Sequence, residues 1–276
     1  MSATMSAPAG PALVATNLTT GYDGKVIIPD LTLAVPDHQV SVIIGGNGCG
    51  KSTLLKTLAR LIRPMGGAVT LDGKAIGTIP TKRLAQRLGL LPQSPLVPDG
   101  VRVADLVARG RFPYQPFLGG MSREDLEAVT EAMEAMGVMD LAERGVDELS
   151  GGQRQRVWIA MALAQRTDVL LLDEPTTYLD IAYQIEILDL LDDLNRRRGT
   201  TVVMVLHDIN LSSRYADHLI ALRRGELYAQ GTPREVVTEQ TMRDVFDLDC
   251  MVIDDPVSGS PLIVPRGRAR ARQQAG

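Results

Sequence analysis

Short continuous apolar runs recur along the chain and are separated by segments with helical spacing. The clearest runs are residues 40–44, 169–173 and 201–206. A strand with one solvent-exposed face would alternate apolar and polar residues, so these runs predict strands that are buried on both faces. Apolar residues at helical spacing follow the first two runs, over 51–62 and 180–194. This order predicts an α/β fold with a mostly parallel sheet and helices on both of its faces.

Alternating segments surround this predicted core. Residues 13–17 and 31–35 alternate apolar and polar positions, and a short strand pattern follows at 68–71. These three segments predict an antiparallel β-subdomain beside the parallel sheet. Late in the chain, the patterns at 219–222 and 227–229 predict a hairpin.

Residues 98–166 have a mostly helical pattern and are predicted to form an inserted α-helical subdomain. Its first helix is expected at 101–108. Ser122 and Asp125 form a capping box that begins another helix. The apolar face of that helix, which we expect to be core rather than a binding surface, consists of Leu126, Val129, Met133 and Met136.

The chain divides into one large domain and shorter ends. Residues 1–12 are small and Pro-rich and are expected to be disordered, whereas 13–235 form the domain, with a short helix beginning at Thr232-Pro233. Residues 236–265 are expected to be an irregular C-terminal extension. In the basic tail at 266–276, arginines alternate with small residues, which predicts solvated disorder, with a contact to anionic lipid or nucleic acid as the alternative.

Composition and charge restrict the partners and the compartment. The 276 residues include 29 basic and 33 acidic side chains, so the net charge of −4 gives no electrostatic reason to expect nucleic acid as a partner. No apolar run approaches the about 18 residues of a membrane span, and the N-terminus lacks the features of a signal peptide. We therefore expect a chain that is neither secreted nor membrane-spanning.

The stretch between the first apolar run and the first helical pattern carries the strongest chemical signal. It fits G-x-x-x-x-G-K-[ST] in the order strand, glycine loop, helix. In such a loop, backbone N–H groups surround phosphate oxygens, the lysine reaches the β/γ-phosphates and the hydroxyl ligates Mg²⁺. The sequence therefore predicts a nucleoside triphosphate site formed by Gly45, Gly46, Asn47, Gly48, Cys49, Gly50, Lys51, Ser52 and Thr53.

The two cysteines, Cys49 and Cys250, are too few for a disulfide framework or a metal cluster, which fits a reducing cytoplasm. Cys49 lies in the phosphate loop, where we expect it to serve as a small residue that fits. A thiolate activated by the helix N-terminus is the alternative.

Two carboxylates end the second apolar run. Asp173 and Glu174 follow Leu172 at the carboxyl end of a predicted parallel strand, where ligands of open α/β sheets bind. Asp173 is expected to hold the Mg²⁺ shell, directly or through water. Glu174 is then available to polarise an attacking water as general base.

A second anion-binding pattern lies at 149–156, where Leu-Ser-Gly-Gly-Gln precedes Arg-Gln-Arg. Ser150, Gly151, Gly152 and Gln153 begin a predicted helix whose first N–H groups point at an anion. This motif resembles the signature of ATP-binding cassette ATPases, which other phosphate-loop families lack. The resemblance implies a homodimer in which two cassettes enclose two ATP molecules, each meeting the signature of the opposite chain.

Four more residues match the same family in order. Tyr22 resembles the aromatic that stacks on adenine, and Gln93 resembles the loop glutamine that touches Mg²⁺ and the attacking water. Asp180 resembles the residue that communicates across the dimer, although alone it would be taken for a helix N-cap. His207 resembles the switch histidine bonded to the γ-phosphate. The resemblance thus implies ATP and Mg²⁺ as cofactors.

Three classes of phosphate-loop protein are compatible with the triphosphate site alone: a transporter motor, a soluble cassette ATPase and a metabolic kinase. The signature excludes the kinase, and a single cassette with a compact insert favours the transporter. Without fused membrane spans, the chain is expected to serve an importer from the cytoplasmic face of the membrane, with a separate permease and, indirectly, a substrate-binding protein.

The segments 108–115 and 173–184 resemble the ferric-siderophore subgroup of these importers, which also includes vitamin B12 and haem importers. The resemblance implies ferric siderophore as the cargo, with vitamin B12 or haem as alternatives. The likeness of the segment 109–115 is expected to concern the permease interface more than catalysis; the alternative for Phe112-Pro113-Tyr114 is a helix-breaking turn with a packed aromatic.

Overall fold

A six-stranded sheet forms the centre of the molecule in the computed structural model, which describes residues 13–93, 100–116, 119–177 and 179–267. Its strand order is β11-β10-β4-β9-β8-β7, and all neighbours are parallel except β10 and β11. The strands are β4 (Val40–Gly45), β7 (Leu88–Leu91), β8 (Val169–Asp173), β9 (Thr201–Val205), β10 (His218–Arg223) and β11 (Glu226–Gly231). The predicted α/β class, the three parallel strands and the late hairpin are confirmed.

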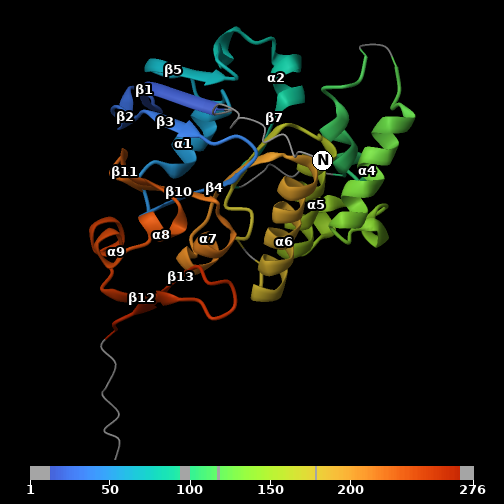
Figure 1. The fold of residues 1–276 in the computed structure, drawn as a ribbon. Coiled ribbons are helices and arrows are strands. Elements are labelled where there is room, and N and C mark those ends of the chain that lie inside the picture. Colours follow the sequence, from blue (N-terminus) through green and yellow to red (C-terminus); the bar gives the residue numbers. More distant parts are fainter. Residues whose placement is uncertain (1–12, 94–99, 117–118, 178, 268–276) are drawn as a thin grey trace, which may run out of the picture.

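Both faces of this sheet are covered, which explains why its central strands are apolar without interruption. In β4, Val42 and Ile44 face one hydrophobic core, whereas Ile43 faces the other. The first core lies under helices α6 (Ile181–Arg198) and α7 (Ile209–Tyr215). The second lies under α1 (Lys51–Leu58) and a smaller sheet (Figure 1).

The smaller sheet is antiparallel, as the alternating segments predict. Its long first strand pairs with the second, third and fifth strands of the chain. The strands are β1 (Leu13–Tyr22), β2 (Lys25–Ile28), β3 (Leu33–Val35), β5 (Gly66–Leu71) and β6 (Lys74–Ala75), followed by the 3₁₀ turn η1 (Ile76–Thr78).

The helix after the phosphate loop ends four residues before the predicted end at Ile62. Helix α1 stops at Leu58 because Arg60 adopts a left-handed backbone conformation with φ of 62°. The Arg60 guanidinium then donates a 2.9 Å hydrogen bond to the carbonyl of Ile76, outside the helix.

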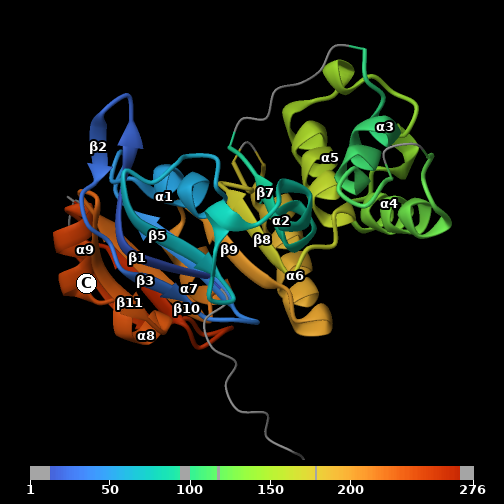
Figure 2. The ribbon, with the colours of Figure 1, turned by 90° about the horizontal axis from the view of Figure 1, so that it is seen from above.

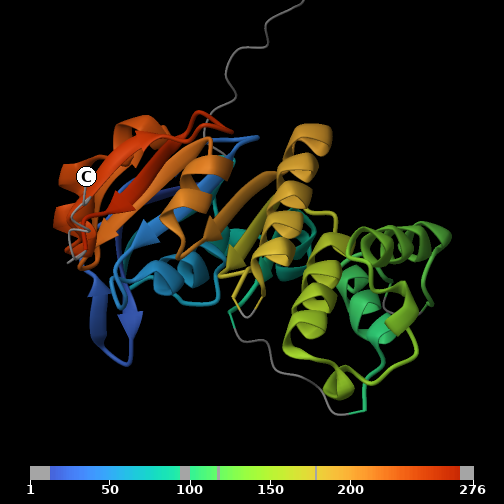
Figure 3. The ribbon, with the colours of Figure 1, turned by 90° about the horizontal axis from the view of Figure 1, so that it is seen from below.

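A group of helices lies at one end of the large sheet, beyond β7 (Figure 2). This helical group contains α3 (Val103–Ala108), η2 (Arg109–Arg111), α4 (Arg123–Ala135), η3 (Met139–Leu141), η4 (Val146–Glu148) and α5 (Gly151–Ala164). Helix α2 (Thr81–Arg87) precedes it and leads directly into β7. Helix α6 lies between the helical group and the C-terminal elements (Figure 3).

The predicted capping box at the start of α4 is confirmed, but the predicted apolar face is wrong at one position. Ser122 Oγ accepts from the N–H of Asp125 at 3.1 Å, and Asp125 Oδ2 accepts from the N–H of Ser122 at 3.0 Å. Leu126 is 55% exposed. Asp125 takes the inward position of the first turn instead, because it pairs with Arg111.

The C-terminal extension is regular over much of its length, so the irregular pattern expected there is corrected. It contains α8 (Pro233–Val236), α9 (Glu239–Phe246) and a hairpin of β12 (Cys250–Asp254) and β13 (Pro261–Pro265). The hairpin packs on α7, where the side chain of Asn210 binds both backbone groups of Ile263. Arg266 forms ion pairs with Glu239 and Asp249.

The ends predicted to be disordered, 1–12 and the tail from 268 onward, lie outside the described residues. Within the described ranges, no helix combines the length and the hydropathy needed to span a bilayer.

Candidate active site

Four parallel strands deliver the predicted site residues to one edge of the large sheet. Gly45 ends β4 and Asp173 ends β8, while Gln93 and His207 each lie two residues beyond the ends of β7 and β9. The carboxyl ends of parallel strands meet at the same edge, where ligands of open α/β sheets bind. Residues from four distant parts of the chain therefore converge there.

The phosphate loop has a backbone that only glycine accommodates at its first turn. Gly45 has φ of 153°, and a Cβ atom there would lie 2.5 Å from the carbonyl oxygen of Leu222. The Nζ atom of Lys51 donates to the carbonyls of Gly45 at 2.8 Å and Gly46 at 3.1 Å. The ammonium group is thus folded over the loop, where it can reach a bound phosphate.

Ser52 and Asp173 form a pair of oxygen donors beneath the loop. Ser52 Oγ donates to Asp173 Oδ1 at 2.9 Å. Asp173 is 1% exposed, and its Oδ2 atom has no hydrogen-bond partner among the described residues. Burial raises the pKa of Asp173, and the Ser52 hydrogen bond and Lys56 oppose that shift. A buried carboxylate oxygen without a partner beside a hydroxyl is a donor set that suits a hard cation such as Mg²⁺.

Glu174 is the centre of a cluster of polar contacts. Its Oε2 atom accepts from Gln93 Nε2 at 2.7 Å and from Thr177 Oγ1 at 3.2 Å, while His207 Nε2 lies 2.6 Å from Oε1. The backbone of Glu174 has φ of 56°, a region that non-glycine residues seldom adopt. The structure therefore brings Gln93, Glu174 and His207 together.

A cavity of about 280 Å³ lies beside this cluster. Sequence analysis did not predict Ile27 as a lining residue or Thr177 as a contact of Glu174. Thr177 lies three residues after Glu174 in a Pro-Thr-Thr turn, which is the only signal for its contact. The cavity is lined by Tyr22, Ile27, Asn47, Gly48, Gly50, Lys51, Ser52, Thr53, Glu174 and His207.

The signature residues and Asp180 occupy helix starts elsewhere in the chain. Ser150 and Gln153 form a capping box at the N-terminus of α5. Asp180 caps α6, accepting from the N–H of Tyr183 at 3.0 Å. Neither 150–153 nor Asp180 is among the described residues that line the cavity. Figure 2 shows α1 and α5 on opposite sides of β7 and β8.

Cys49 is buried in the phosphate loop. Burial raises the pKa of its thiol, more than the nearby Lys51 ammonium lowers it. The thiol keeps its proton at neutral pH, which supports the interpretation of Cys49 as a small residue that fits the loop.

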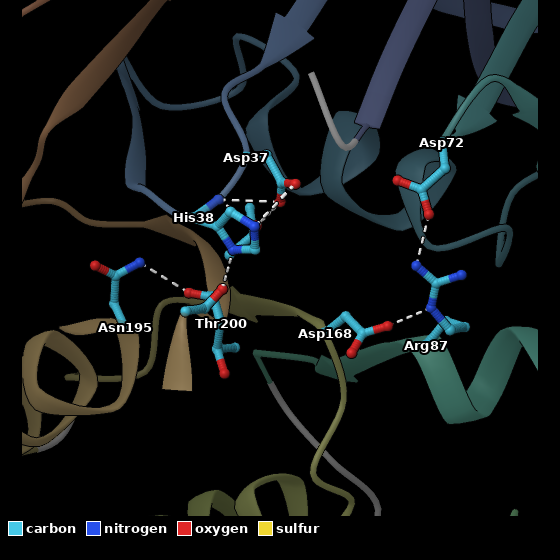
Figure 4. Close-up of polar contacts among 9 residues, drawn as sticks. Asp37, His38, Asp72, Arg87, Asp168, Asn195 and Thr200 are labelled. Atoms are coloured by element: carbon cyan, nitrogen blue, oxygen red, sulfur yellow. Dashed lines mark hydrogen bonds and ion pairs between the residues drawn. The ribbon is translucent and has the colours of Figure 1, made fainter. Parts of the chain in front are cut away.

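A second hollow, of about 260 Å³, lies at the opposite edge of the sheet, before β4, β8 and β9 begin (Figure 4). Its ionisable side chains are paired: Asp37 contacts His38, Arg87 pairs with both Asp72 and Asp168, and Arg166 and Arg198 pair with Glu131 outside the hollow. Because these groups are paired and lie at the amino ends of the strands, this hollow does not belong to the phosphate site.

Comparison with known proteins decides the family. Residues 28–177, more than half of the chain, match the ABC transporter family. The chain belongs to the ATP-binding cassette family. It is 54% identical to the ferric enterobactin transport ATP-binding protein of Escherichia coli strain K12, over 91% of this chain and 93% of that protein. It is 51% identical to the petrobactin import ATP-binding protein FpuD of Bacillus anthracis, over 94% and 95%.

The ATP-binding cassette fold is confirmed by solved structures. A dimeric cassette in a post-hydrolysis state, with ADP and phosphate bound, superimposes with a TM-score of 0.71 at 29% identity, over 80% of this chain and 98% of that one. The predicted family, and with it the prediction of an ATP-binding ATPase subunit of a transport system, is confirmed.

Proposed function

We propose that this ATPase is the motor of an importer that takes up ferric siderophores. The observation that carries the cargo is the extent of the similarity: it covers more than nine-tenths of this chain and of relatives named for ferric enterobactin and petrobactin import. In this proposal, the domain at 13–235, with its helical insert at 98–166, binds and hydrolyses ATP. Residues 236–265 form an extension of that domain.

The phosphate loop and Tyr22 form the ATP site in this proposal. The loop N–H groups and Lys51 hold the β- and γ-phosphates. Tyr22 is 44% exposed at the rim of the cavity, which leaves its ring accessible for stacking on adenine. Such stacking contributes roughly 1–3 kcal/mol by analogy with bases on aromatic side chains.

Ser52, Asp173 and Gln93 are the residues that would hold Mg²⁺. The unpartnered Oδ2 atom of Asp173 supports this assignment. The ion would supply positive charge that neutralises the transferred phosphoryl group.

Glu174 is proposed as the general base. A water beside the γ-phosphate loses a proton to a carboxylate oxygen of Glu174, and Gln93 and Thr177 orient that carboxylate. His207 contacts the same carboxylate from the other side and lines the same cavity as the phosphate loop, which supports a turn of its ring to the γ-phosphate when ATP enters. When His207 turns to the γ-phosphate, its contact with the Glu174 carboxylate is released, so that the carboxylate is available as the base only when ATP is bound.

The signature at Ser150, Gly151, Gly152 and Gln153 is proposed to bind the ATP of a second copy of the chain. The cavity beside the phosphate loop is not lined by these residues, which supports a role outside the same chain's site. The Ser150 hydroxyl accepts one hydrogen bond from Gln153 and still has its proton to donate to a phosphate oxygen. Asp180 is proposed to lie at the same dimer interface.

The remaining partners follow from the importer assignment. The chain would bind a separate permease at the cytoplasmic face of the membrane and act with a substrate-binding protein only through that permease. Nucleic acid is not proposed as a partner. Vitamin B12 and haem are the alternative cargoes.

Uptake by a deletion strain tests the cargo. Loss of this gene is expected to abolish accumulation of a radiolabelled ferric chelate and to slow growth under iron limitation. The wild-type gene should restore both, and the Lys51→Ala gene neither, because that variant loses the phosphate-binding ammonium. Unchanged chelate uptake in the deletion strain, with no redundant cassette present, contradicts the siderophore assignment and directs the test to vitamin B12 and haem.

A further inference from the structure

The segment 109–115, which we name the junction segment, connects the helical group to the rest of the molecule. Arg111 attaches the first residues of this segment to the helical group. The Arg111 side chain is 2% exposed, pairs through Nε with Asp125 Oδ1 at 2.8 Å, and donates through Nη1 to the carbonyl of Ala164 at 3.0 Å. Arg111 therefore joins η2, α4 and α5 into one unit.

Tyr114 extends this unit toward α2. Its ring centre lies 3.9 Å from the Arg111 guanidinium, a cation–π distance. Its hydroxyl contacts the carbonyls of Gln86 at 3.2 Å and Arg166 at 3.4 Å. Burial raises the pKa of Tyr114, so the hydroxyl keeps its single proton, which these two carbonyls share as acceptors.

Two side chains of α2 return contacts to the junction segment. Gln86 Nε2 donates to the carbonyl of Pro113 at 2.8 Å, and Lys82 Nζ donates to that of Gln115 at 2.7 Å. Helix α2 leads into β7, and Gln93 lies two residues beyond that strand. The junction segment thus binds the helix that leads to a residue in contact with Glu174.

The topology explains why such a lateral contact matters. The chain leaves β7 at its carboxyl end to enter the helical group and returns from α5 to the amino end of β8. Because β7 and β8 are neighbours, the two covalent connections lie at opposite ends of one line along the strands. The helical group can therefore rotate about the line that joins these two connections unless other contacts hold it in place.

Other side-chain contacts also join the helical group to the rest of the molecule. Gln165 Nε2, at the end of α5, donates to the carbonyl of Ala85 in α2, and Gln155 Nε2 donates to that of Pro175 at 2.9 Å.

The contact made by Glu131 is more exposed. Glu131 of α4 pairs with Arg166 at 2.7 Å and with Arg198 of α6 at 3.0 Å, but its side chain is 53% exposed. Exposed pairs are screened by salt and contribute little. The half-buried Tyr114 hydroxyl is therefore a stronger restraint than these exposed pairs, and it acts together with the contacts of Gln155 and Gln165.

We propose that Tyr114 is a positioning residue for ATP-driven dimerisation. Its hydroxyl holds the helical group against α2, so that the signature on α5 is presented at a fixed distance from the phosphate loop of the same chain. Two such distances must match when two chains enclose two nucleotides. This inference rests on the proposed composite site between two copies of the chain.

The test uses the full chain with Glu174→Gln, in which bound ATP persists. Tyr114→Phe is added, which removes the hydroxyl and keeps the ring over Arg111. Tyr228→Phe is the matched control, because it removes another tyrosine hydrogen bond, to Asp244, far from the junction segment. The affinity of the monomer for a fluorescent ATP analogue and the dimer dissociation constant with ATP are measured for each.

Tyr114→Phe is expected to raise the dimer dissociation constant about tenfold, the usual effect of one lost hydrogen bond, with nucleotide affinity changed less than about twofold. With Glu174 intact, the protein concentration for half-maximal ATPase activity should rise by a similar factor at unchanged KM for ATP. Tyr228→Phe should match its parent in both respects. Gln86→Ala, which removes the contact with Pro113, should shift dimerisation in the same direction, so the test does not depend on one variant.

The possible failures differ. If the parent dimerises with ATP and Tyr114→Phe and Gln86→Ala dimerise equally well, the positioning role is overturned while the composite site stands. If the Glu174→Gln parent remains monomeric with ATP, the composite site is overturned and the positioning role with it.

Discussion

Glu174 shows how much one residue depends on its neighbours. Its carboxylate is held on one oxygen by Gln93 and Thr177 and on the other by His207. The three contacts therefore orient the carboxylate.

Replacing Glu174 by Gln tests this role. The amide keeps the size of the side chain but cannot accept a proton, so kcat is expected to fall by roughly 10²–10⁴ with ATP binding retained. Phosphate release and ATP affinity are the measurements. Glu134→Gln, an exposed position on α4, is the control and should match wild type. Turnover at the wild-type rate in a verified Glu174→Gln preparation would remove Glu174 from the role of base.

At this scale, the sequence was informative where a motif specifies a position and uninformative where folding brings side chains together. Gln93, Glu174 and His207 were identifiable from their order along the chain. Thr177 was not, because its contact with Glu174 depends on a turn with a left-handed residue. Asp125 was identified as a cap, but its pairing with Arg111 depends on tertiary packing.

Helix α4 illustrates the scale of whole elements. Its first turn contains a capping box and a buried ion pair that share Asp125. Burial raises the pKa of Asp125, but hydrogen bonds from Arg111 and Ser122 outweigh burial, and the pKa is lowered overall. The charged form of Asp125 thus stabilises the folded state.

Asp125→Asn is expected to lower the free energy of unfolding by about 3–5 kcal/mol, because Arg111 remains buried without a charged partner. Since the folded-state pKa of Asp125 is below its unfolded value near 4, this stabilisation is present above pH about 4 and is lost as the pH falls further. Urea unfolding across pH measures both effects. The exposed Asp105→Asn on α3 should change stability by less than about 0.5 kcal/mol. Equal stability of Asp125→Asn and wild type would contradict the role of the pair.

The C-terminal elements show why other parts could not be predicted. Strands β12 and β13 are as long as β8 and β9, but each buries only its first residue fully, so burial imposes no clear apolar pattern on them. Their formation depends on contacts with distant residues, such as the bond between Asn210 and Ile263. Strands β4, β8 and β9 were predictable because burial on both faces imposes continuous apolar runs.

In the whole molecule, the two helix starts that are proposed to bind phosphate lie apart from each other. Helix α1 begins at the phosphate loop, whereas α5 begins at Ser150 in the helical group, on the other side of β7 and β8 (Figure 2). This separation supports the proposed composite arrangement, in which each chain contributes one half of two shared ATP sites.

Mixing two inactive variants tests this arrangement. Lys51→Ala damages the phosphate loop and Ser150→Arg damages the signature, so a mixed dimer has one site with both defects and one intact site. Partial ATPase activity should return on mixing, measured as phosphate release against each variant alone. Normal hydrolysis by either variant alone, as a monomer at high dilution, would contradict a site shared between chains.

The double burial of β4, β8 and β9 has a mechanical consequence. Strands packed on both faces open only when much of the domain unfolds, so the platform that holds Gly45, Asp173 and His207 behaves as a stiff body. The free energy of nucleotide binding is then not spent on bending this sheet. It remains available to move the helical group relative to the sheet, as a transport ATPase requires.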